Sequence, residues 1–227
     1  MSWVEADVLF RSGKALRFPI QTTATALVYY HRYCDFCEQQ NRPVSTLPTK
    51  TKSNLFTAIL FLAGKATENI RRIREVLNVV RYLHSGSRPE ELALHDYQSM
   101  KETVVEQEHH LLRVLAFSTE IDLPHAYLLN MARYLQVGSR EVKCAWMYLN
   151  GALYDSQIVH DCPALVAIAC LCLGCETCRD TRKPEDSYKE TGTRDSKWWL
   201  RFEISESQLQ HACEWIQKAA QYEPATT

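Results

Sequence analysis

The fold is decided by residues 55–64, LFTAILFLAG, which are apolar on every side when wound into a helix. Such a helix is surrounded by other helices rather than laid on a surface. A second run of the same kind, PALVAIACLCL, covers residues 163–173, and its Ala167-Ile168 pair follows Ala58-Ile59 by 109 residues. The sequence therefore predicts two similar units, each built around one buried helix.

Helices account for the rest of the pattern. Apolar residues recur every three or four positions, and seven glycines leave little turn chemistry for hairpins. We expect an all-α chain of two tandem five-helix units, with domains at residues 1–120 and 121–227. The expected helices cover about residues 4–16, 20–37, 70–83, 96–117, 140–154, 163–173 and 205–222, with two more starting near Ser53 and at Pro124. The polar segment Glu176 to Lys197 is expected to be the least ordered part.

Composition limits the classes of partner. The 227 residues, 46% of them hydrophobic, are enough to bury two modest cores. Lys and Arg number 26 against 27 Asp and Glu, so the net charge of -1 gives no reason to expect nucleic acid as a partner. No apolar run approaches the roughly 18–20 residues that span a bilayer, and Glu5 and Asp7 stand where a signal peptide would carry positive charge. We expect a soluble, intracellular protein that does not bind membranes.

One carboxylate interrupts an apolar helix face. The apolar side chains of the helix expected at 96–117 line up as Tyr97, Val104, Leu111 and Leu115. Glu108 falls on the same face. Burying a carboxylate without a partner costs several kcal/mol by order of magnitude. The pattern therefore predicts that Glu108 has a partner.

Nine cysteines raise the question of a metal site. Cys34 and Cys37 have the spacing of zinc ligands, and so do the cysteines at 172, 175 and 178. The first pair lies on one expected helix, and the second group begins inside an apolar helix far away in the sequence. We therefore expect reduced, buried thiols and no metal or other cofactor. Structural zinc is the rival hypothesis, with Cys175 and Cys178 as its ligands.

Local motifs do not predict an enzyme. No nucleophile with its base, no paired-carboxylate pocket and no Gly-rich phosphate loop can be assembled from them. His109 and His110 stand near Glu106 and Glu108, but adjacent helical residues point about 100° apart, which favours a solvated helix face over a metal site.

Three segments in this order resemble the cyclin boxes: TTATALVYYHRY at 22–33, FLAGK at 61–65 and EHHLLRVLAF at 108–117. The likeness spans nearly the whole chain and is to the transcription-associated cyclins. RRIREVLNV at 71–79 resembles cyclin L, while PHAYLL at 124–129 and KWW before Phe202 resemble cyclin Q and cyclin K. The Met-Arg-Ala-Ile-Leu docking patch of cell-cycle cyclins has no counterpart in the first eighteen residues.

The resemblance implies a catalytically silent subunit that binds and activates a cyclin-dependent protein kinase in transcription or RNA-processing control. It implies a nuclear location, with a cytoplasmic one left open, and a heterodimer with the kinase. On this view ATP and magnesium belong to the kinase. The alternative is a cyclin-fold adaptor or a zinc-binding scaffold that does not activate a kinase.

The resemblance also implies a binding site. Positions matching Lys65 and Glu108 contact the regulatory helix of the kinase in cyclins. A lysine at a helix end and a glutamate on an apolar stripe can satisfy each other and still offer hydrogen bonds to a partner. The flanking positions that match the family are Leu62, Leu112, Phe117 and Glu68, with Thr67 in place of a usual acidic residue. From spacing alone, such a pair is more often intramolecular or solvated.

Overall fold

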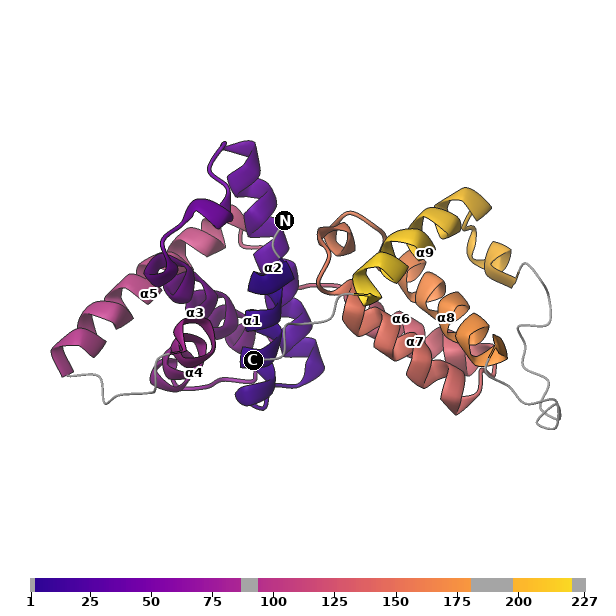
Figure 1. Cartoon of the computed structure of the whole chain (residues 1–227), viewed down its shortest axis with the longest axis horizontal. Coiled ribbons are helices and arrows are strands. Elements are labelled where there is room, and N and C mark those ends of the chain that lie inside the picture. Colours follow the sequence, from indigo (N-terminus) through magenta and orange to yellow (C-terminus); the bar gives the residue numbers. More distant parts are fainter. Residues whose placement is uncertain (1–2, 87–93, 181–197, 222–227) are drawn as a thin grey trace. The chain divides into compact units, whose positions relative to one another are not determined.

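Every element that the structure describes is a helix, which confirms the all-α prediction. The computed structural model describes residues 3–86, 94–180 and 198–221 (Figure 1). The chain divides into two compact units, Met1–Ile121 and Asp122–Thr227. Within the described ranges, no helix has both the length and the apolar character that crossing a membrane requires.

The first unit is organised around α3, Thr49–Ala66. Its other elements are α1 (Trp3–Ala15), α2 (Ile20–Gln39), the 3-10 helix η1 (Val44–Thr46), α4 (Ile73–Ser85) and α5 (Leu94–Val114). Helix α3 packs against α2, α4 and α5 (Figure 1). Seven of its apolar side chains are at most 5% exposed: Leu55, Phe56, Ala58, Ile59, Leu60, Leu62 and Ala63. Helix α3 is therefore the central helix predicted from residues 55–64.

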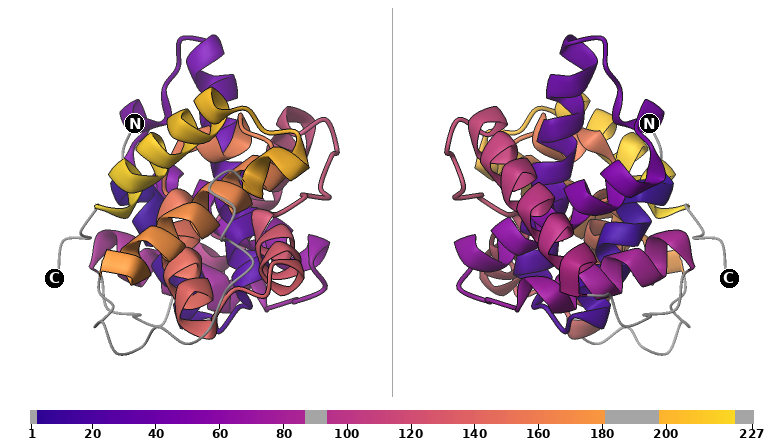
Figure 2. Two further views of the ribbon diagram at one scale, coloured as in Figure 1. Left: turned by 90° about the vertical axis from the view of Figure 1, so that its right-hand side faces the viewer. Right: turned by 90° about the vertical axis from the view of Figure 1, so that its left-hand side faces the viewer.

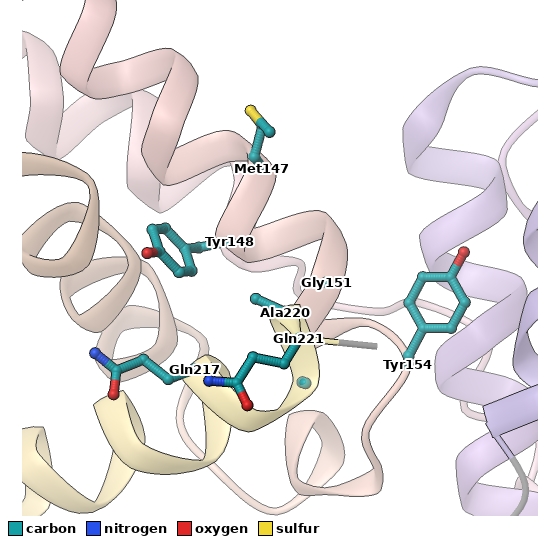
Figure 3. A pocket seen from close by; sticks show the side chains of 8 residues that line it. Met147, Tyr148, Gly151, Tyr154, Gln217, Ala220 and Gln221 are labelled. Atoms are coloured by element: carbon teal, nitrogen blue, oxygen red, sulfur yellow. The ribbon is translucent and has the colours of Figure 1, made fainter. Parts of the chain in front are cut away.

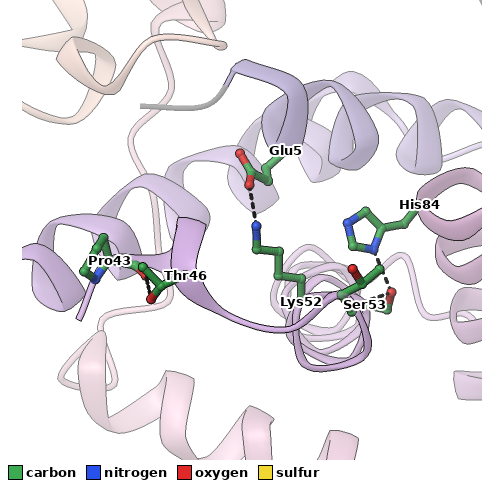
Figure 4. A network of polar contacts seen from close by, with 7 residues as sticks. Glu5, Pro43, Thr46, Lys52, Ser53 and His84 are labelled. Carbon is green, nitrogen blue, oxygen red and sulfur yellow. Dashed lines mark hydrogen bonds and ion pairs between the residues drawn. The ribbon is translucent and has the colours of Figure 1, made fainter.

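Polar contacts fasten the neighbouring helices to the start of α3 (Figure 4). Lys52 donates to Glu5 of α1, with 2.9 Å between Nζ and Oε1. The hydroxyl of Ser53 lies 2.8 Å from Nδ1 of His84 in α4. Because Glu5 is buried, Lys52 supplies the counter-charge that makes its burial tolerable. Helices α1 and α4 are thus both tied to the same end of the central helix.

The second unit repeats the plan around α8, Pro163–Asp180. Its other elements are α6 (Pro124–Tyr134), α7 (Ser139–Ala152), the 3-10 helices η2 (Ser156–Val159) and η5 (Trp198–Phe202), and α9 (Glu206–Ala220). Helix α8 packs against α6, α7 and α9, and Figure 2 shows the yellow α9 lying across the orange α8. Residues 166–171 of α8 are at most 1% exposed. Helix α8 thus has the place in this unit that α3 has in the first.

Two helix starts differ from the sequence prediction by three residues or more. Helix α3 begins at Thr49 rather than near Ser53, because Pro48 has a φ of −59° that suits the start of a helix. Helix α4 begins at Ile73 rather than near residue 70, because Arg72 has an extended backbone with ψ 134°. Local backbone conformation, which apolar periodicity does not report, sets both boundaries.

The end of α8 also differs from the prediction. The helix continues from Glu176 to Asp180, where the sequence predicted the start of a poorly ordered segment. The rest of that segment, residues 181–197, lies outside the described residues. In the second unit the described residues form four α-helices together with η5 and η2, where five helices were expected.

Several helices end in a strained residue. Among the described residues, seven other than glycine lie just after a helix with φ between 49° and 58°: Arg17, Asn41, Glu68, Ala116, Phe117, Gln136 and Glu203. At Gln136, its N–H donates to Arg133 O (3.2 Å) and the N–H of Val137 donates to Ala132 O (2.9 Å). This is the Schellman pattern, in which glycine is the preferred left-handed residue. A side chain at positive φ costs about 1 kcal/mol or more.

Gln136→Gly should therefore raise the free energy of unfolding by about 1 kcal/mol, because the position is exposed and the glycine removes the strain. Thermal unfolding followed by circular dichroism should show a midpoint raised by about 2–4 °C. Gln136→Ala is the control, since it shortens the side chain but keeps the Cβ atom. Equal midpoints for the two variants would contradict the strain argument.

Candidate functional site

The last turn of α3 and the middle of α5 meet in an ion pair. Lys65 Nζ lies 2.7 Å from Oε1 and 2.9 Å from Oε2 of Glu108. Both carboxylate oxygens therefore accept from one ammonium group. The pairing expected from the apolar face of α5 is present in the structure.

The two partners differ in exposure. The Glu108 side chain is 7% exposed, whereas the Lys65 side chain is 44% exposed. An ammonium group has three N–H donors, and the carboxylate takes two of them, which leaves one for another acceptor. The buried carboxylate therefore holds the ammonium group in place, and the lysine is the partner that is accessible at the surface.

A ring also holds the ammonium group. Lys65 Nζ lies 4.3 Å from the centre of the Phe61 ring, within the range of a cation–π interaction. Phe61 precedes Lys65 by one helical turn, so the two side chains lie on the same face of α3. Phe61 was missed in the sequence analysis, although this four-residue spacing could have revealed it.

The backbone around Lys65 is fixed by the end of α3. Glu68 has φ 58°, and the N–H of Asn69 donates to Gly64 O at 2.8 Å. A Cβ atom on Gly64 would lie 3.1 Å from Asn69 O and 3.3 Å from the Phe18 ring, so this close turn favours glycine. The tight turn that ends α3 therefore lies directly beside Lys65.

The end of α5 presents an aromatic ring to solvent. Ala116 and Phe117 have φ of 49° and 58°, and the Phe117 N–H donates to Leu112 O at 2.9 Å. Phe117 is 70% exposed. An aromatic residue at positive φ is an uncommon, strained arrangement, and such strain is typical of binding sites.

The remaining predicted site residues have different environments. Leu62 is 5% exposed, so it supports the surface from inside the core. Leu112 is half-buried, and Glu68 is exposed at the end of α3. Ile70, which follows that helix end and is 67% exposed, adds an apolar side chain that the sequence analysis did not single out.

The histidines and cysteines considered as metal ligands lie in other surroundings. Within residues 3–86, 94–180 and 198–221, no three His, Cys, Asp or Glu side chains are placed to hold a metal ion. His109 and His110 are exposed, and the ring of His110 lies edge-on to Tyr33 with 5.9 Å between centres. Cys175 and Cys178, the ligands of the zinc hypothesis, are buried in α8.

A cavity of about 580 Å³ lies in the second unit (Figure 3). Its lining comes from α7, α9 and the residues that follow them: Met147, Tyr148, Gly151, Tyr154, Gln217, Ala219, Ala220 and Gln221. None of these side chains is charged at neutral pH, so the cavity offers no acid–base pair. It contains none of the residues predicted for the site.

Comparison with known proteins finds similar sequences and similar folds. No protein-family model matches the chain. It is 26% identical to cyclin-L2 of Mus musculus over 216 residues, which cover 92% of this chain and 38% of that protein. It is 28% identical to cyclin-L1 of Homo sapiens over 216 residues, covering 91% and 37%. The chain is thus similar to cyclins over more than nine tenths of its length.

The resemblance to transcription-associated cyclins, cyclin L among them, is thereby confirmed. The chain spans less than two fifths of the length of these cyclin-L relatives. Its fold matches a chain of the yeast RNA polymerase II CTD kinase CTDK-1 complex with a TM-score of 0.73 at 19% identity, covering 95% of this chain and 64% of that one. A chain of the CAK complex of Chaetomium thermophilum matches with a TM-score of 0.62 at 15% identity, covering 95% and 61%. These matches support tandem cyclin boxes as the architecture.

The exposure difference within the ion pair predicts unequal effects on stability. Lys65→Met should lower the free energy of unfolding by about 2 kcal/mol, because it leaves the Glu108 carboxylate buried without a cation. The double variant Lys65→Met/Glu108→Leu should recover most of this loss, since no buried charge remains. Urea unfolding of both variants measures the difference. A double variant that is no more stable than Lys65→Met would contradict the prediction.

Proposed function

We propose that this chain is a regulatory subunit that binds and activates a cyclin-dependent protein kinase. The observation that carries the proposal is the Lys65–Glu108 pair, with its carboxylate buried and its lysine 44% exposed at the end of the central helix. The similarity to cyclin-L1 and cyclin-L2 supports the same function. On this proposal the chain is not an enzyme, and it contributes binding energy alone.

The proposed mechanism is a shift in the kinase's conformational equilibrium. The ends of α3 and α5 bind the kinase's regulatory helix in its inward position, where the kinase completes its own Lys-Glu ion pair. ATP, magnesium and phosphoryl transfer belong to the kinase. A hundredfold shift toward the active state requires binding that state about 2.7 kcal/mol more tightly than the inactive one. A few well-placed contacts at the centre of an interface can supply that difference.

Each site residue has a distinct role in this mechanism. Lys65 donates its remaining N–H to an acceptor on the kinase helix, and Glu108 holds the ammonium group in place. Leu112 and the exposed Phe117 provide apolar contact beside the pair, and Glu68 provides a charge at the rim. Docking apolar side chains around the lysine excludes water, which strengthens its hydrogen bond to the partner.

The proposed setting is transcription or RNA processing in the nucleus. The CTDK-1 complex, whose chain shares this fold, is an RNA polymerase II CTD kinase. The similarity to cyclin L points to the same branch of the family. Substrates of the assembled kinase would therefore be sought among proteins of the transcription machinery.

The test is a pull-down of endogenous kinases with the wild-type chain and with Lys65→Ala/Glu108→Ala. The wild type should recover a cyclin-dependent kinase that the double variant does not, because the variant lacks the polar anchor. The matched control is Glu214→Ala/Lys218→Ala, which removes one exposed acid and one exposed base from α9. Circular dichroism checks that all three proteins are helical. If the folded wild type recovers no such kinase, the chain is instead a cyclin-fold adaptor for another protein.

Phe117→Ala should weaken binding of the recovered kinase by about tenfold or more, because an aromatic anchor at an interface often contributes over 1 kcal/mol. Its effect on the stability of the free chain should be small, since the ring is 70% exposed. Tyr134→Ala is a matched control, because Tyr134 is also 70% exposed but lies at the end of α6. Binding is measured by titration of the purified kinase. Equal affinities of the two variants would remove Phe117 from the site.

A further inference from the structure

Two cysteines from different helices of the second unit have their sulfur atoms in contact. Cys144 Sγ in α7 lies 3.3 Å from Cys178 Sγ in α8. A disulfide bond measures about 2.05 Å, so the sulfur atoms need to approach by roughly 1.2 Å to bond. Side-chain rotation can supply most of such a movement if the two backbones are already close.

The backbones of α7 and α8 are close at this point. A Cβ atom on Gly174 of α8 would lie 2.6 Å from Ala145 N and 2.7 Å from Glu141 O of α7. Gly174 is one helical turn before Cys178, and Ala145 directly follows Cys144. A disulfide requires Cα atoms within about 7 Å, and this glycine contact brings the helices together next to the two thiols.

The two thiols differ in access. Cys144 is half-buried, whereas Cys178 is 1% exposed. Burial, followed by the hydrogen bond with Cys144, raises the pKa of Cys178 to about 11. A reagent in solution therefore meets Cys144 first, and Cys178 is placed to react second.

We propose that Cys144 and Cys178 are a redox-active pair that forms a reversible disulfide by exchange with a low-molecular-mass disulfide such as oxidised glutathione. The Cys144 thiolate attacks one sulfur of oxidised glutathione, forms a mixed disulfide and releases one glutathione thiolate. The Cys178 thiolate then attacks Cys144 Sγ and releases the second glutathione. The protons of the two protein thiols end on the two released glutathiones, so the protein is oxidised by two electrons and oxidised glutathione is reduced.

Other cysteine pairs that the sequence suggests are less suited to this reaction. Cys34 and Cys37 are three residues apart on α2, and Cys175 and Cys178 are three apart on α8. Such residues have Cβ atoms about 5–6 Å apart on an intact helix, whereas a disulfide requires about 3.8 Å. The bond between α7 and α8 needs no unwinding of either helix.

The test treats the folded, full-length chain with oxidised glutathione, counts free thiols and maps the linkage by mass spectrometry. Digestion must cut at Asp155 or Asp161, because residues 144–178 contain no Lys or Arg and trypsin would leave both cysteines on one peptide. The expected result is a loss of two of the nine thiols and a linked peptide pair joining Cys144 to Cys178. Reduction should restore nine thiols, and oxidation should raise the thermal midpoint.

Two variants make the result specific. Cys144→Ser should abolish the linkage at a half-buried position that tolerates serine, and Cys213→Ser, also half-buried, should leave it intact. Circular dichroism shows whether each variant is folded. The proposal would be overturned if the folded wild type lost no thiols, or if the linkage formed through other cysteines or between chains. It would also be overturned if Cys144→Ser lost two thiols as the wild type does.

Discussion

The packing of α3 against α5 in the first unit includes a carboxylate buried on an apolar face. Glu108 lies between Val104 and Leu111 on the side of α5 that packs against α3, and both of these neighbours are fully buried. Lys65 provides its counter-charge from the end of α3. Because an unpaired buried charge is costly, the pair favours one register of the two helices over others. The same constraint places the lysine at the surface of the unit.

The ends of α3 and α5 form the surroundings of the Lys65–Glu108 pair. Gly64 allows the chain to turn back tightly after α3, and the left-handed Glu68 completes the helix end. At the end of α5, two successive left-handed residues turn the Phe117 ring outward. A folded chain gains little by itself from an exposed, strained aromatic residue. In the proposed complex, the kinase covers the Phe117 ring.

Much of this organisation could be predicted from the sequence, because it depends on the pattern of apolar and charged residues within single helices. Residues 55–64 are apolar all round, which is typical of a helix surrounded by other helices. Glu108 required a partner because it falls on an apolar stripe. The start of α4 could not be placed, because the extended backbone of Arg72 sets it rather than periodicity. The start of α3 was missed, although Pro48 marks it in the sequence. The contact between Cys144 and Cys178 was not predicted. The two residues lie on different helices, and a contact of that kind produces no regular interval in the sequence.

The 109-residue interval that relates Ala58 to Ala167 also relates Lys65 to Gly174. In the first unit this position carries a charged, half-exposed side chain, whereas in the second it is pressed against the backbone of α7. A side chain of any size at Gly174 would collide with Ala145, so this position of α8 cannot carry a counterpart of the lysine. The two units are therefore alike in architecture but differ in surface chemistry at this position. If a kinase binds at Lys65 as proposed, the second unit has no equivalent of that site, because a glycine stands at the matching position.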